Sequence, residues 1–530
     1  MLRISNLSLP LGYDDAAVRR ALLNRLSVPA SALLGFTLVR RSVDARDKRD
    51  IHFVVSLDIS LRDEASVLKR CRFLSPSPVR KSSAPVRVSL PSRPLVVGAG
   101  PAGLFAALTL ARAGAAPVLI ERGRPAPERT VDVLRLQSDG ILDPESNVQF
   151  GEGGAGAFSD GKLTCGIKSP FMADVLRTLA DHGAPEDILV DQKPHIGTDL
   201  LRKVTVSIRN EIISLGGEVR FSTRLEELII QGGRINGAVL GNSGSRYEFL
   251  TDCVMLCIGH SARDTVRGLF GQGVRMEKKP FAMGVRIEHP RAFIDKAQYG
   301  TFAGHPALGA ASYKLVCHTP DGRGVYTFCM CPGGRVIAAA SEEGGVVTNG
   351  MSFHGRDDEN SNSALLVGVR TEDFGSDHVL SGMELQRRIE AAAFTLAGGG
   401  YRAPAQRVED FLSGRQSRAF GDVVPSYLPG VVPCDLAELL PSFITEDLRF
   451  GIKSMDRQLR GFAMPDAVLT GPETRSSSPV RFSRDESGEA EGISGLYPVG
   501  EGAGFAGGIV SAAIDGISSA RRLMEKYSRA

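Results

Sequence analysis

The chain has 530 residues, of which 42% are hydrophobic and 23% charged. This composition excludes a disordered or fibrous protein and predicts about two to four domains. The 63 Lys and Arg residues nearly balance the 60 Asp and Glu residues, and the resulting net charge of +3 excludes a uniformly basic nucleic-acid-binding protein. Residues 1–90 hold 16 of the basic and 8 of the acidic residues, so positive charge is concentrated at the front.

The front of the chain predicts a small basic α+β module over residues 1–75. Its expected elements follow the βαββ order of a split βαβ unit: a strand at 2–7, a helix at 14–26, and strands at 36–43 and 50–59. Five prolines and six serines fall within residues 73–94. That composition is typical of a linker, which we place at 76–94.

Targeting and membrane segments are not predicted. The first residues contain no apolar run of signal-peptide length, and acidic residues come early, so we expect a cytoplasmic protein. The most apolar stretch, residues 102–120, is interrupted by Arg112 and Gly114 and does not predict a membrane span. The eight cysteines form no CxxC pair, and His195 and His260 lack metal-ligand spacing. We therefore predict reduced cysteines and no metal site.

After residue 94 the pattern changes to alternating strands and helices, which predicts a parallel α/β sheet over residues 95–261. The expected elements are strands at 95–97, 118–120, 218–221 and 253–258, a helix at 198–215, and a meander of strands at 224–230, 235–240 and 246–250. Residues 262–472, with one clear helix at 383–396, are interpreted as an inserted mixed α+β substrate domain. Residues 473–530, with a strand at 495–499 and a helix at 508–524, return to the first sheet.

The spacing GxGxxG occurs three times, and the first match has the full context of a dinucleotide-binding turn. Its residues are Gly98, Gly100, Pro101, Ala102 and Gly103, between an apolar strand and a helix. The next strand ends in Glu121 and Arg122, and Glu121 lies 18 residues beyond Gly103. Glycines permit close backbone approach, the helix N-terminus suits a pyrophosphate, and the acid suits a ribose hydroxyl. Glu121 also disfavours a 2'-phosphate, because two anions would meet there.

The second and third matches leave alternatives open. The second, at residues 151–156, contains Gly154 and Ala155 and predicts either a flexible surface loop or a loop whose amides lie against a cofactor. The third, at residues 502–507, follows Glu501 and precedes a helix that begins near Gly508 and Ile509. It predicts either an ordinary strand-helix turn or a helix N-terminus, including Gly507, that holds an electron-rich ligand group.

The meander and the returning C-terminal strand and helix resemble the glutathione-reductase-type FAD proteins over residues 94–259 and 495–524. This resemblance implies an FAD whose pyrophosphate lies on the first glycine motif and whose adenosine ribose binds Glu121. It also implies a ribitol contact at Gly500 and Glu501, where that family has Gly-Asp. The family's Ala-Thr-Gly turn reads Cys-Ile-Gly here, so only Gly259 is carried over.

A narrower resemblance covers nearly all of the chain after the linker. It is similar to the large, mostly uncharacterised FAD-dependent dehydrogenases with a small N-terminal domain, through the strings VQFGEGGAGAFSDGKL, IGHSARDT, FAMGVRIEHP, GVYTFCMCPGG, ETRSSSPVRF and YPVGEGAGFAGGIVSAAIDGI. This resemblance implies bound FAD and redox chemistry, and it supplies no substrate.

We therefore predict an FAD-dependent oxidoreductase that passes hydride between an unidentified substrate and flavin N5. Candidates near the reacting face are Asp160, Lys162 and Arg475, and the alternative for each is a solvated turn. Cys329 and Cys331 alternate along an apparent strand, which favours core packing over redox chemistry. The electron donor is left open between NAD(P)H that docks transiently, the substrate and a partner protein.

Two other functions are kept as alternatives. One is a binding protein on the same fold that carries out no redox reaction, because function belongs to sites rather than to folds. The other is an FAD-dependent RNA-modifying enzyme, suggested by the basic front module, although residues 49–57 lack the glycine and aromatic spacing of an RNA-binding strand.

Overall fold

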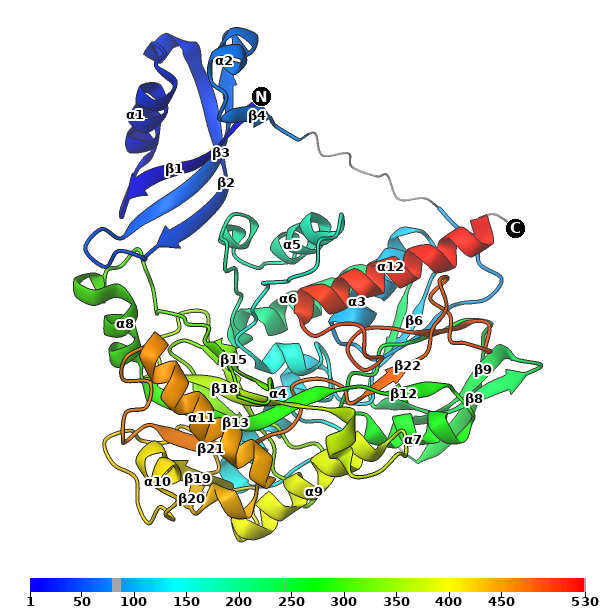
Figure 1. Ribbon diagram of the computed structural model, residues 1–530. Coiled ribbons are helices and arrows are strands. Elements are labelled where there is room, and N and C mark those ends of the chain that lie inside the picture. Colours follow the sequence, from blue (N-terminus) through cyan, green and yellow to red (C-terminus); the bar gives the residue numbers. More distant parts are fainter. Residues whose placement is uncertain (79–86, 243, 529–530) are drawn as a thin grey trace.

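The structure is a computed structural model that describes residues 1–78, 87–242 and 244–528. Its three largest sheets have four, five and seven strands, and Figure 1 shows the four-stranded sheet standing apart from the other two. The predicted fold class is confirmed, with a parallel sheet, an antiparallel meander and a mixed inserted part.

The four-stranded sheet belongs to the front part, in the antiparallel order β2-β3-β1-β4. The elements are β1 (Leu2–Pro10), α1 (Asp15–Leu26), β2 (Leu33–Asp44), β3 (His52–Leu61), α2 (Glu64–Arg70) and β4 (Leu74–Pro76). Alternate residues of β3 are buried under both helices in one apolar core. The structure adds α2 and β4 to the predicted βαββ order and completes a ferredoxin-like arrangement. The pattern missed these elements because α2 buries a single apolar residue and β4 lies where prolines begin.

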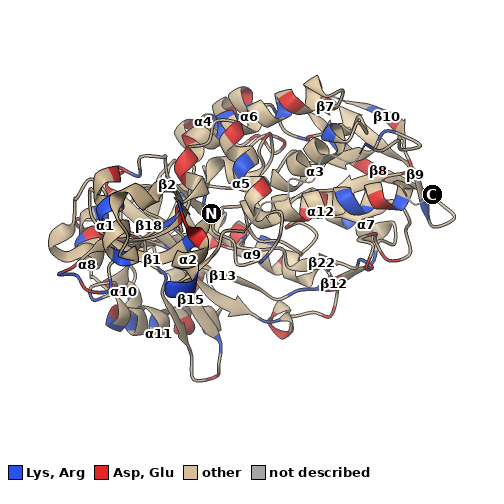
Figure 2. Ribbon diagram, turned by 90° about the horizontal axis from the view of Figure 1, so that it is seen from above, with Lys and Arg blue, Asp and Glu red and all other residues tan. Residues whose placement is uncertain are grey.

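Part of the predicted linker, residues 79–86, lies outside the described residues. The described part of the linker after this gap contacts the rest of the chain, because the backbone N–H of Val88 donates to the carbonyl oxygen of Ala113 at 3.0 Å. The front part also contacts the rest of the chain through β2, where Arg41 Nε donates to Asp191 Oδ1 at 2.7 Å. Figure 2 shows both signs of charge over the whole molecule, and basic residues of the front part such as Arg3 and Arg46 are paired with neighbouring acids.

The second part is a five-stranded parallel sheet in the order β7-β6-β5-β11-β23. Its strands are β5 (Leu95–Val97), β6 (Val118–Ile120), β7 (Glu218–Arg220), β11 (Val254–Leu256) and β23 (Leu496–Pro498). Every residue of β5, β6, β11 and β23 is buried, as expected for parallel strands covered on both faces. Strand β23 comes from the end of the chain and pairs with β11.

Helices cover one face of this sheet and the meander covers the other. The helices are α3 (Pro101–Arg112), α5 (Met172–Asp181), α6 (Thr198–Ser214) and α12 (Ile509–Ser528), and the meander is β8 (Thr223–Gln231), β9 (Arg234–Asn242) and β10 (Ser245–Leu250). Val96 packs with the helices, whereas Leu95 and Val97 pack with the meander. Figure 1 shows α3 and α12 side by side, although they lie about 400 residues apart in the chain. Helices α4 (Ala126–Asp139) and α7 (Arg263–Gly271) flank this part.

The third part is a seven-stranded sheet in the order β14-β15-β18-β13-β21-β19-β20. Its strands are β13 (Phe281–Pro290), β14 (Val316–His318), β15 (Gly324–Cys331), β18 (Asn360–Val369), β19 (Ala403–Arg407), β20 (Val431–Pro433) and β21 (Val468–Glu473). Its helices are α8 (Arg291–Tyr299), α9 (Ser381–Leu396), α10 (Val408–Ser413) and α11 (Ser442–Gln458). Two small antiparallel pairs complete the fold: β16 (Arg335–Ala338) with β17 (Thr348–Met351), and β12 (Met276–Lys278) with β22 (Val480–Phe482).

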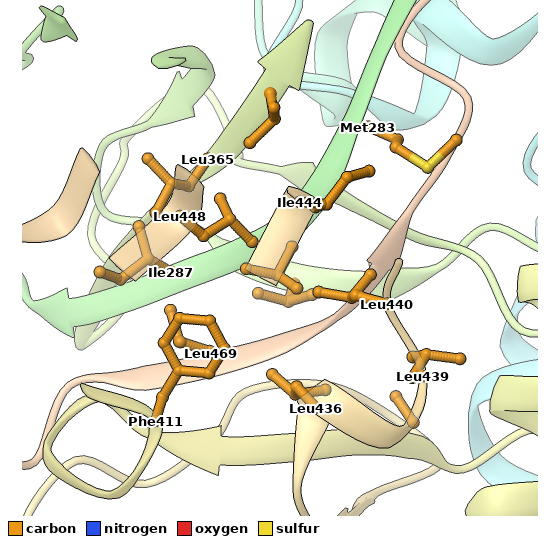
Figure 3. Close-up of a cluster of buried hydrophobic side chains, with 14 of the residues drawn as sticks. Met283, Ile287, Leu365, Phe411, Leu436, Leu439, Leu440, Ile444, Leu448 and Leu469 are labelled. Carbon is orange, nitrogen blue, oxygen red and sulfur yellow. The ribbon is translucent and has the colours of Figure 1, made fainter. Parts of the chain in front are cut away.

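The core of the third part lies between its sheet and α11. Ile444 and Leu448, one turn apart on α11, meet Ile287, Leu365 and Leu469 from three adjacent strands (Figure 3). Within the described ranges, no helix is long and apolar enough to cross a membrane.

Candidate functional site

The first glycine match forms the turn between β5 and α3. Gly98 has φ +105°, and a Cβ there would lie 2.4 Å from the carbonyl oxygen of Cys257. A Cβ on Gly103 would lie 1.8 Å from the carbonyl oxygen of Gly98, so only glycine allows α3 to pack this closely. Gly100 instead faces open space, where a Cβ would meet no atom closer than 3.8 Å. Helix α3 begins at Pro101, so its first N–H groups have no helical acceptors.

Glu121, at the end of β6, connects the first glycine segment with the second. Its carboxylate accepts the backbone N–H groups of Ala99 at 2.8 Å and of Gly123 and Gly151 at 2.9 Å each. A carboxylate offers about four lone-pair positions. Three amide donors therefore leave capacity for one further donor, such as a hydroxyl of a bound molecule.

The second glycine match packs directly against the first. A Cβ on Gly154, where φ is +59°, would lie 2.9 Å from Gly100 Cα, and one on Gly156 would lie 3.1 Å from Ile509 Cγ1 of α12. The residues at 151–153 are buried and those at 154–156 are partly buried, so the segment is packed against the protein rather than fully exposed. This segment joins the turn before α3 to the start of α12.

The third glycine match lies beside the turn that follows β11. A Cβ on Gly502 would lie 2.3 Å from the carbonyl oxygen of Gly259. The backbone N–H of Gly500 donates to Asp515 Oδ2 at 2.7 Å. The three glycine segments thus converge from distant parts of the chain on one place.

They border a single cavity of about 610 Å³. Most predicted site residues line it: Gly98, Gly100, Pro101, Ala102, Glu121, Arg122, Gly154, Ala155, Lys162, Gly259, Arg475, Glu501, Gly507, Gly508 and Ile509. Three predicted residues do not line it: Asp160, Gly103 and Gly500. Gly103 and Gly500 hold the turns, and Asp160 lies behind the wall.

Asp160 is buried and orients the cations in front of it. Arg356 donates to its carboxylate through Nε at 3.0 Å and Nη2 at 2.5 Å, and the Ser352 hydroxyl also donates to it. Burial opposes ionisation, but Lys162 and Arg356 outweigh it and lower the pKa of Asp160 to about 2. Lys162 Nζ lies 3.7 Å from Asp160 Oδ2 and has no hydrogen-bond partner. Its ammonium protons are therefore available to a molecule in the cavity.

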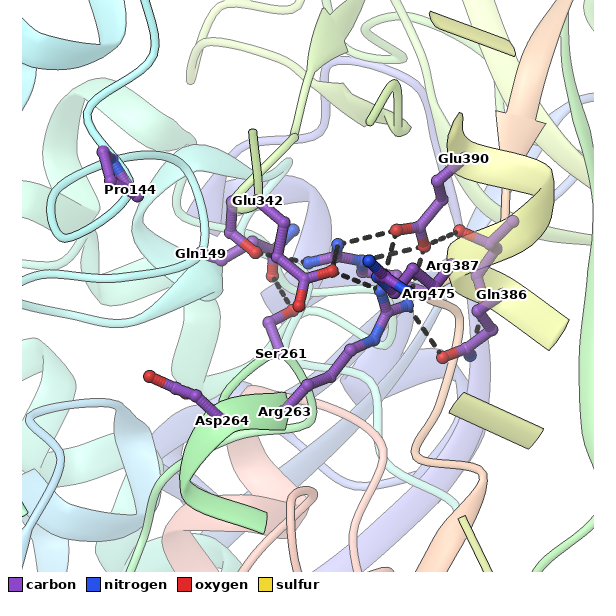
Figure 4. A network of polar contacts seen from close by, with 12 residues as sticks. Pro144, Gln149, Ser261, Arg263, Asp264, Glu342, Gln386, Arg387, Glu390 and Arg475 are labelled. Atoms are coloured by element: carbon purple, nitrogen blue, oxygen red, sulfur yellow. Dashed lines mark hydrogen bonds and ion pairs between the residues drawn. The ribbon is translucent and has the colours of Figure 1, made fainter. Parts of the chain in front are cut away.

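Arg475 is held by a buried network that joins the second and third parts. Figure 4 shows the Glu390 carboxylate between the guanidinium groups of Arg263 and Arg475. Arg263 donates to both carboxylate oxygens at 2.8 Å, and Arg475 donates through Nη2 at 2.8 Å and Nε at 3.1 Å. Glu342 and Gln386 accept further hydrogen bonds from Arg263. Because Arg263 starts α7 and Glu390 lies on α9, this network fixes the turn after β11 to the inserted part.

Two further groups at the cavity have perturbed pKa values. Burial, reinforced by Arg475 and Arg263, lowers the pKa of His260 to about 3, so this imidazole is neutral at pH 7. Burial raises the pKa of Glu501 to about 8, and Lys279 opposes the rise. Glu501 can therefore be a protonated hydrogen-bond donor at neutral pH.

Sequence reasoning missed much of the wall contributed by the third part. The additional lining side chains include Lys193, Tyr313, Lys314, Cys329, Asn349, Arg356 and Glu473. They come from loops and strand ends separated by long intervals, so no local spacing pattern marks them. Cys329 and Cys331 were noted in the sequence, but the alternation of a regular strand favoured a packing role for both.

Comparison with known proteins adds three family matches. Residues 93–131 match the FAD binding domain, residues 280–476 match "FAD-dependent protein, C-terminal domain-like", and residues 1–60 match a domain of unknown function. An uncharacterized protein of Clostridium beijerinckii is 47% identical over 531 residues and covers 99% of both chains.

Solved structures show more distant likeness. A geranylgeranyl bacteriochlorophyll reductase-like protein from Thermoplasma acidophilum aligns with a TM-score of 0.36 and 12% identity over 82% of each chain. Glycerol-3-phosphate dehydrogenase from Bacillus halodurans, complexed with FAD, aligns with a TM-score of 0.34 and 11% identity, covering 84% of this chain and 65% of that one.

Proposed function

The chain belongs to the family of FAD-dependent proteins that it shares with the Clostridium beijerinckii relative, and from this premise we propose that it is a flavin oxidoreductase acting on an anionic small molecule. The observation that carries the proposal is the single cavity. It extends from the dinucleotide turn at Gly98 to basic side chains of the inserted part.

The residues present fit FAD. Glycine at 98 and 103 is required by backbone contacts, and Gly100 leaves open space beside the start of α3, where a pyrophosphate would be held. The free acceptor position of Glu121 suits a ribose hydroxyl. The N–H groups at the start of α12, with Gly507 and Gly508, would hold the electron-rich edge of the ring. When bound, FAD supplies a two-electron acceptor and donor for carbon substrates.

The chain's own residues would bind and orient the substrate. Lys162, Lys193 and Arg356 line one end of the cavity, and Asp160 behind them supplies one carboxylate. Partial desolvation, together with the charges of Arg356 and Lys162, lowers the pKa of Lys193. This crowding of like charges favours an anionic ligand, because such a ligand would relieve the repulsion.

Arg475 and Glu501 would act beside this cluster. Arg475 presents a guanidinium that Glu390 holds in one orientation, and a fixed guanidinium can pair with a carboxylate in two hydrogen bonds. Glu501, protonated at neutral pH, would donate a hydrogen bond or a proton at its carboxyl oxygen. Three classes of electron donor are proposed, namely NAD(P)H, the substrate and a protein partner, and the first two can be tested with small molecules.

The experiment starts from purified protein supplied with FAD and freed of excess. We expect the absorption of oxidised flavin, and its loss under anaerobic mixing with NADH, NADPH or an oxidisable carboxylic acid. Protein that retains no FAD would contradict the proposal. Retained FAD that only dithionite reduces would instead favour a binding protein without redox activity.

A further inference from the structure

Cys329 and Cys331 lie at the end of β15, where the strand departs from regular geometry. The pairing of β15 with β18 shifts register between Phe328 and Cys331, and Cys329 has φ +43°, an uncommon value for a residue with a side chain. The bulge breaks the alternation expected from the sequence. As a result, Cys329 lines the cavity while Cys331 is fully buried behind it.

The Cys331 side chain contacts the backbone of Cys329. The Cys331 thiol donates to the Cys329 carbonyl oxygen at 3.2 Å, and both cysteines are free thiols. The pKa of Cys329 is lowered first by a hydrogen bond from the Cys331 thiol, and also by Lys162 and Arg286, whereas burial opposes the shift. The same contact, with burial, raises the pKa of Cys331. The Cys329 thiol therefore ionises more readily than the Cys331 thiol beside it.

Cations hold this segment in place. Arg286 donates to the Cys329 carbonyl oxygen from Nη2 at 3.0 Å and Nη1 at 3.3 Å and pairs with Glu473 at 3.1 Å. Lys162 has an ammonium group without a hydrogen-bond partner on the same cavity. Acidic groups also face the pair: Glu473 and Glu501 are close enough that the Cys329 charge raises the pKa of each.

Another cysteine on the cavity provides a contrast. Cys257 also lines it, but burial, with a smaller effect of Asp515, raises the pKa of its thiol. Buried cysteines in apolar surroundings are inert, whereas a thiolate beside cations is reactive. Of the two cysteines that line the cavity, Cys329 is therefore the one beside cations that favour its ionised form.

We propose that Cys329 and Cys331 are a redox-active pair that exchanges two electrons with FAD bound in the cavity. In the oxidative direction the Cys329 thiolate and the Cys331 thiol form one S–S bond. The S–H bond of Cys331 would break, two electrons and one proton would reduce FAD to its reduced anion, and the reverse step would restore the Cys329 thiolate and the Cys331 thiol. The pair would thereby store a second pair of electrons beside the flavin. This inference goes beyond the proposed function, which needs only the flavin and the substrate cations.

The test uses the FAD-loaded full-length protein. After mild oxidation, anaerobic titration with dithionite should consume about four electrons per FAD in the wild type, because disulfide and flavin each accept about two. Cys329→Ser and Cys331→Ser should each consume about two. Cys317→Ser, on the adjacent strand β14, is the matched control and should behave as the wild type.

A second readout does not depend on flavin. Trypsin releases residues 324–335, which contain Cys329 and Cys331 and no other cysteine. In oxidised protein this peptide should be about 2 Da lighter and resist alkylation until reduced. Because Cys329→Ser retains a side chain at positive φ, Cys329→Gly provides a variant that relieves backbone strain and still lacks the thiol.

The outcomes separate this inference from the proposed function. A wild type that consumes about two electrons per FAD, with both thiols alkylated after oxidation, would overturn the redox pair and leave the flavin reaction intact. A protein that retains no FAD but forms the peptide disulfide would overturn the proposed function. This outcome would also overturn the electron exchange with FAD, and only the disulfide between the two cysteines would remain supported.

Discussion

The two ends of the cavity are built in different ways. At the end bordered by β5 and α3, the main features are backbone atoms, and glycine contacts such as that between Gly103 and Gly98 fix their positions. At the other end the main features are charged side chains, and buried partners such as Asp160 and Glu390 fix those. We therefore expect substitutions that add atoms to disrupt the first end, and substitutions that remove charges to disrupt the second.

This difference corresponds to the two tasks proposed for the site. Backbone amides are present in every sequence, so they can hold a cofactor whose chemistry does not change. Side chains can vary while the fold is kept, so they define which substrate reacts. Paired variants at each end can test whether the division is real.

The largest effect is expected for Gly103→Ala. The new Cβ would overlap the Gly98 carbonyl oxygen, so the turn must open, and we expect the free energy of unfolding to fall by about 4 kcal/mol or more, with loss of FAD. Gly100→Ala is the matched variant, because its Cβ has space within the protein but borders the cavity. It should lower stability by about 1 kcal/mol and weaken FAD binding by about 100-fold. Urea unfolding measures stability, and flavin absorbance measures FAD binding. Equal losses of stability in the two variants would contradict the distinction between a glycine that packs against the turn and one that faces the cavity.

The next effect is expected for Glu390→Ala. Removing this carboxylate leaves the buried guanidinium groups of Arg263 and Arg475 without their main partner, which should lower the free energy of unfolding by about 3–5 kcal/mol. Glu384→Ala, on the same helix, breaks an exposed pair with Arg267 and should change stability by less than about 1 kcal/mol. Urea unfolding of both variants would detect the difference. Similar small losses would show that the network is not needed to hold the two parts together.

The same distinction explains what could be predicted from the sequence. The turn at 98–103, its strand and its helix are contiguous, and their residue types follow from local backbone geometry, so the spacing predicted them. The second and third glycine segments could be recognised in the sequence, but their positions in the fold could not be predicted. Their positions depend on contacts such as Gly156 with Ile509, across about 350 residues of chain.

The third part was predicted least well. Strands β13 and β18 are buried on both faces, so they lack the alternation that reveals a half-exposed strand. The Glu390 network joins segments far apart in sequence, and neither Glu390 nor Arg263 has a local signal. The bulge at Cys329 breaks the alternation of a regular strand, so Cys329 lines the cavity whereas Cys331 is buried as a packing role predicts.

A smaller effect is expected when charge is removed from the substrate end. Lys193→Gln deletes one cation, whose Nζ donates only to Ser312 at 3.1 Å, without leaving a carboxylate unpaired. With succinate as the probe, we expect the dissociation constant to rise about tenfold through loss of one charge-assisted contact. Perturbation of the flavin absorbance measures binding, and Lys203→Gln, exposed on α6, is the control. Unchanged succinate affinity in the Lys193 variant would argue against an anionic substrate.

The last effect is expected in the pH dependence of stability, through Glu501, which lines the cavity. Burial raises the pKa of its carboxyl from 4.5 to about 8 in the folded protein, so the folded state keeps the proton over a pH range in which the unfolded state loses it. The stability from this group is therefore complete below pH 4.5 and is lost as the pH rises to about 8. In protein freed of FAD we expect Glu501→Gln to remove this loss of stability between pH 4.5 and about 8, because the amide does not titrate.

Urea unfolding at several pH values gives the difference between wild type and Glu501→Gln. Buried Glu152 and Glu288 remain in both proteins, so their effects cancel. Glu491→Gln, in an exposed pair with Arg275, is the control and should parallel the wild type. If the difference did not change with pH, Glu501 would be hydrated like a surface acid. A charged carboxylate at that position would then repel the anionic substrate that the neighbouring cations attract, and proton donation would have to come from another group.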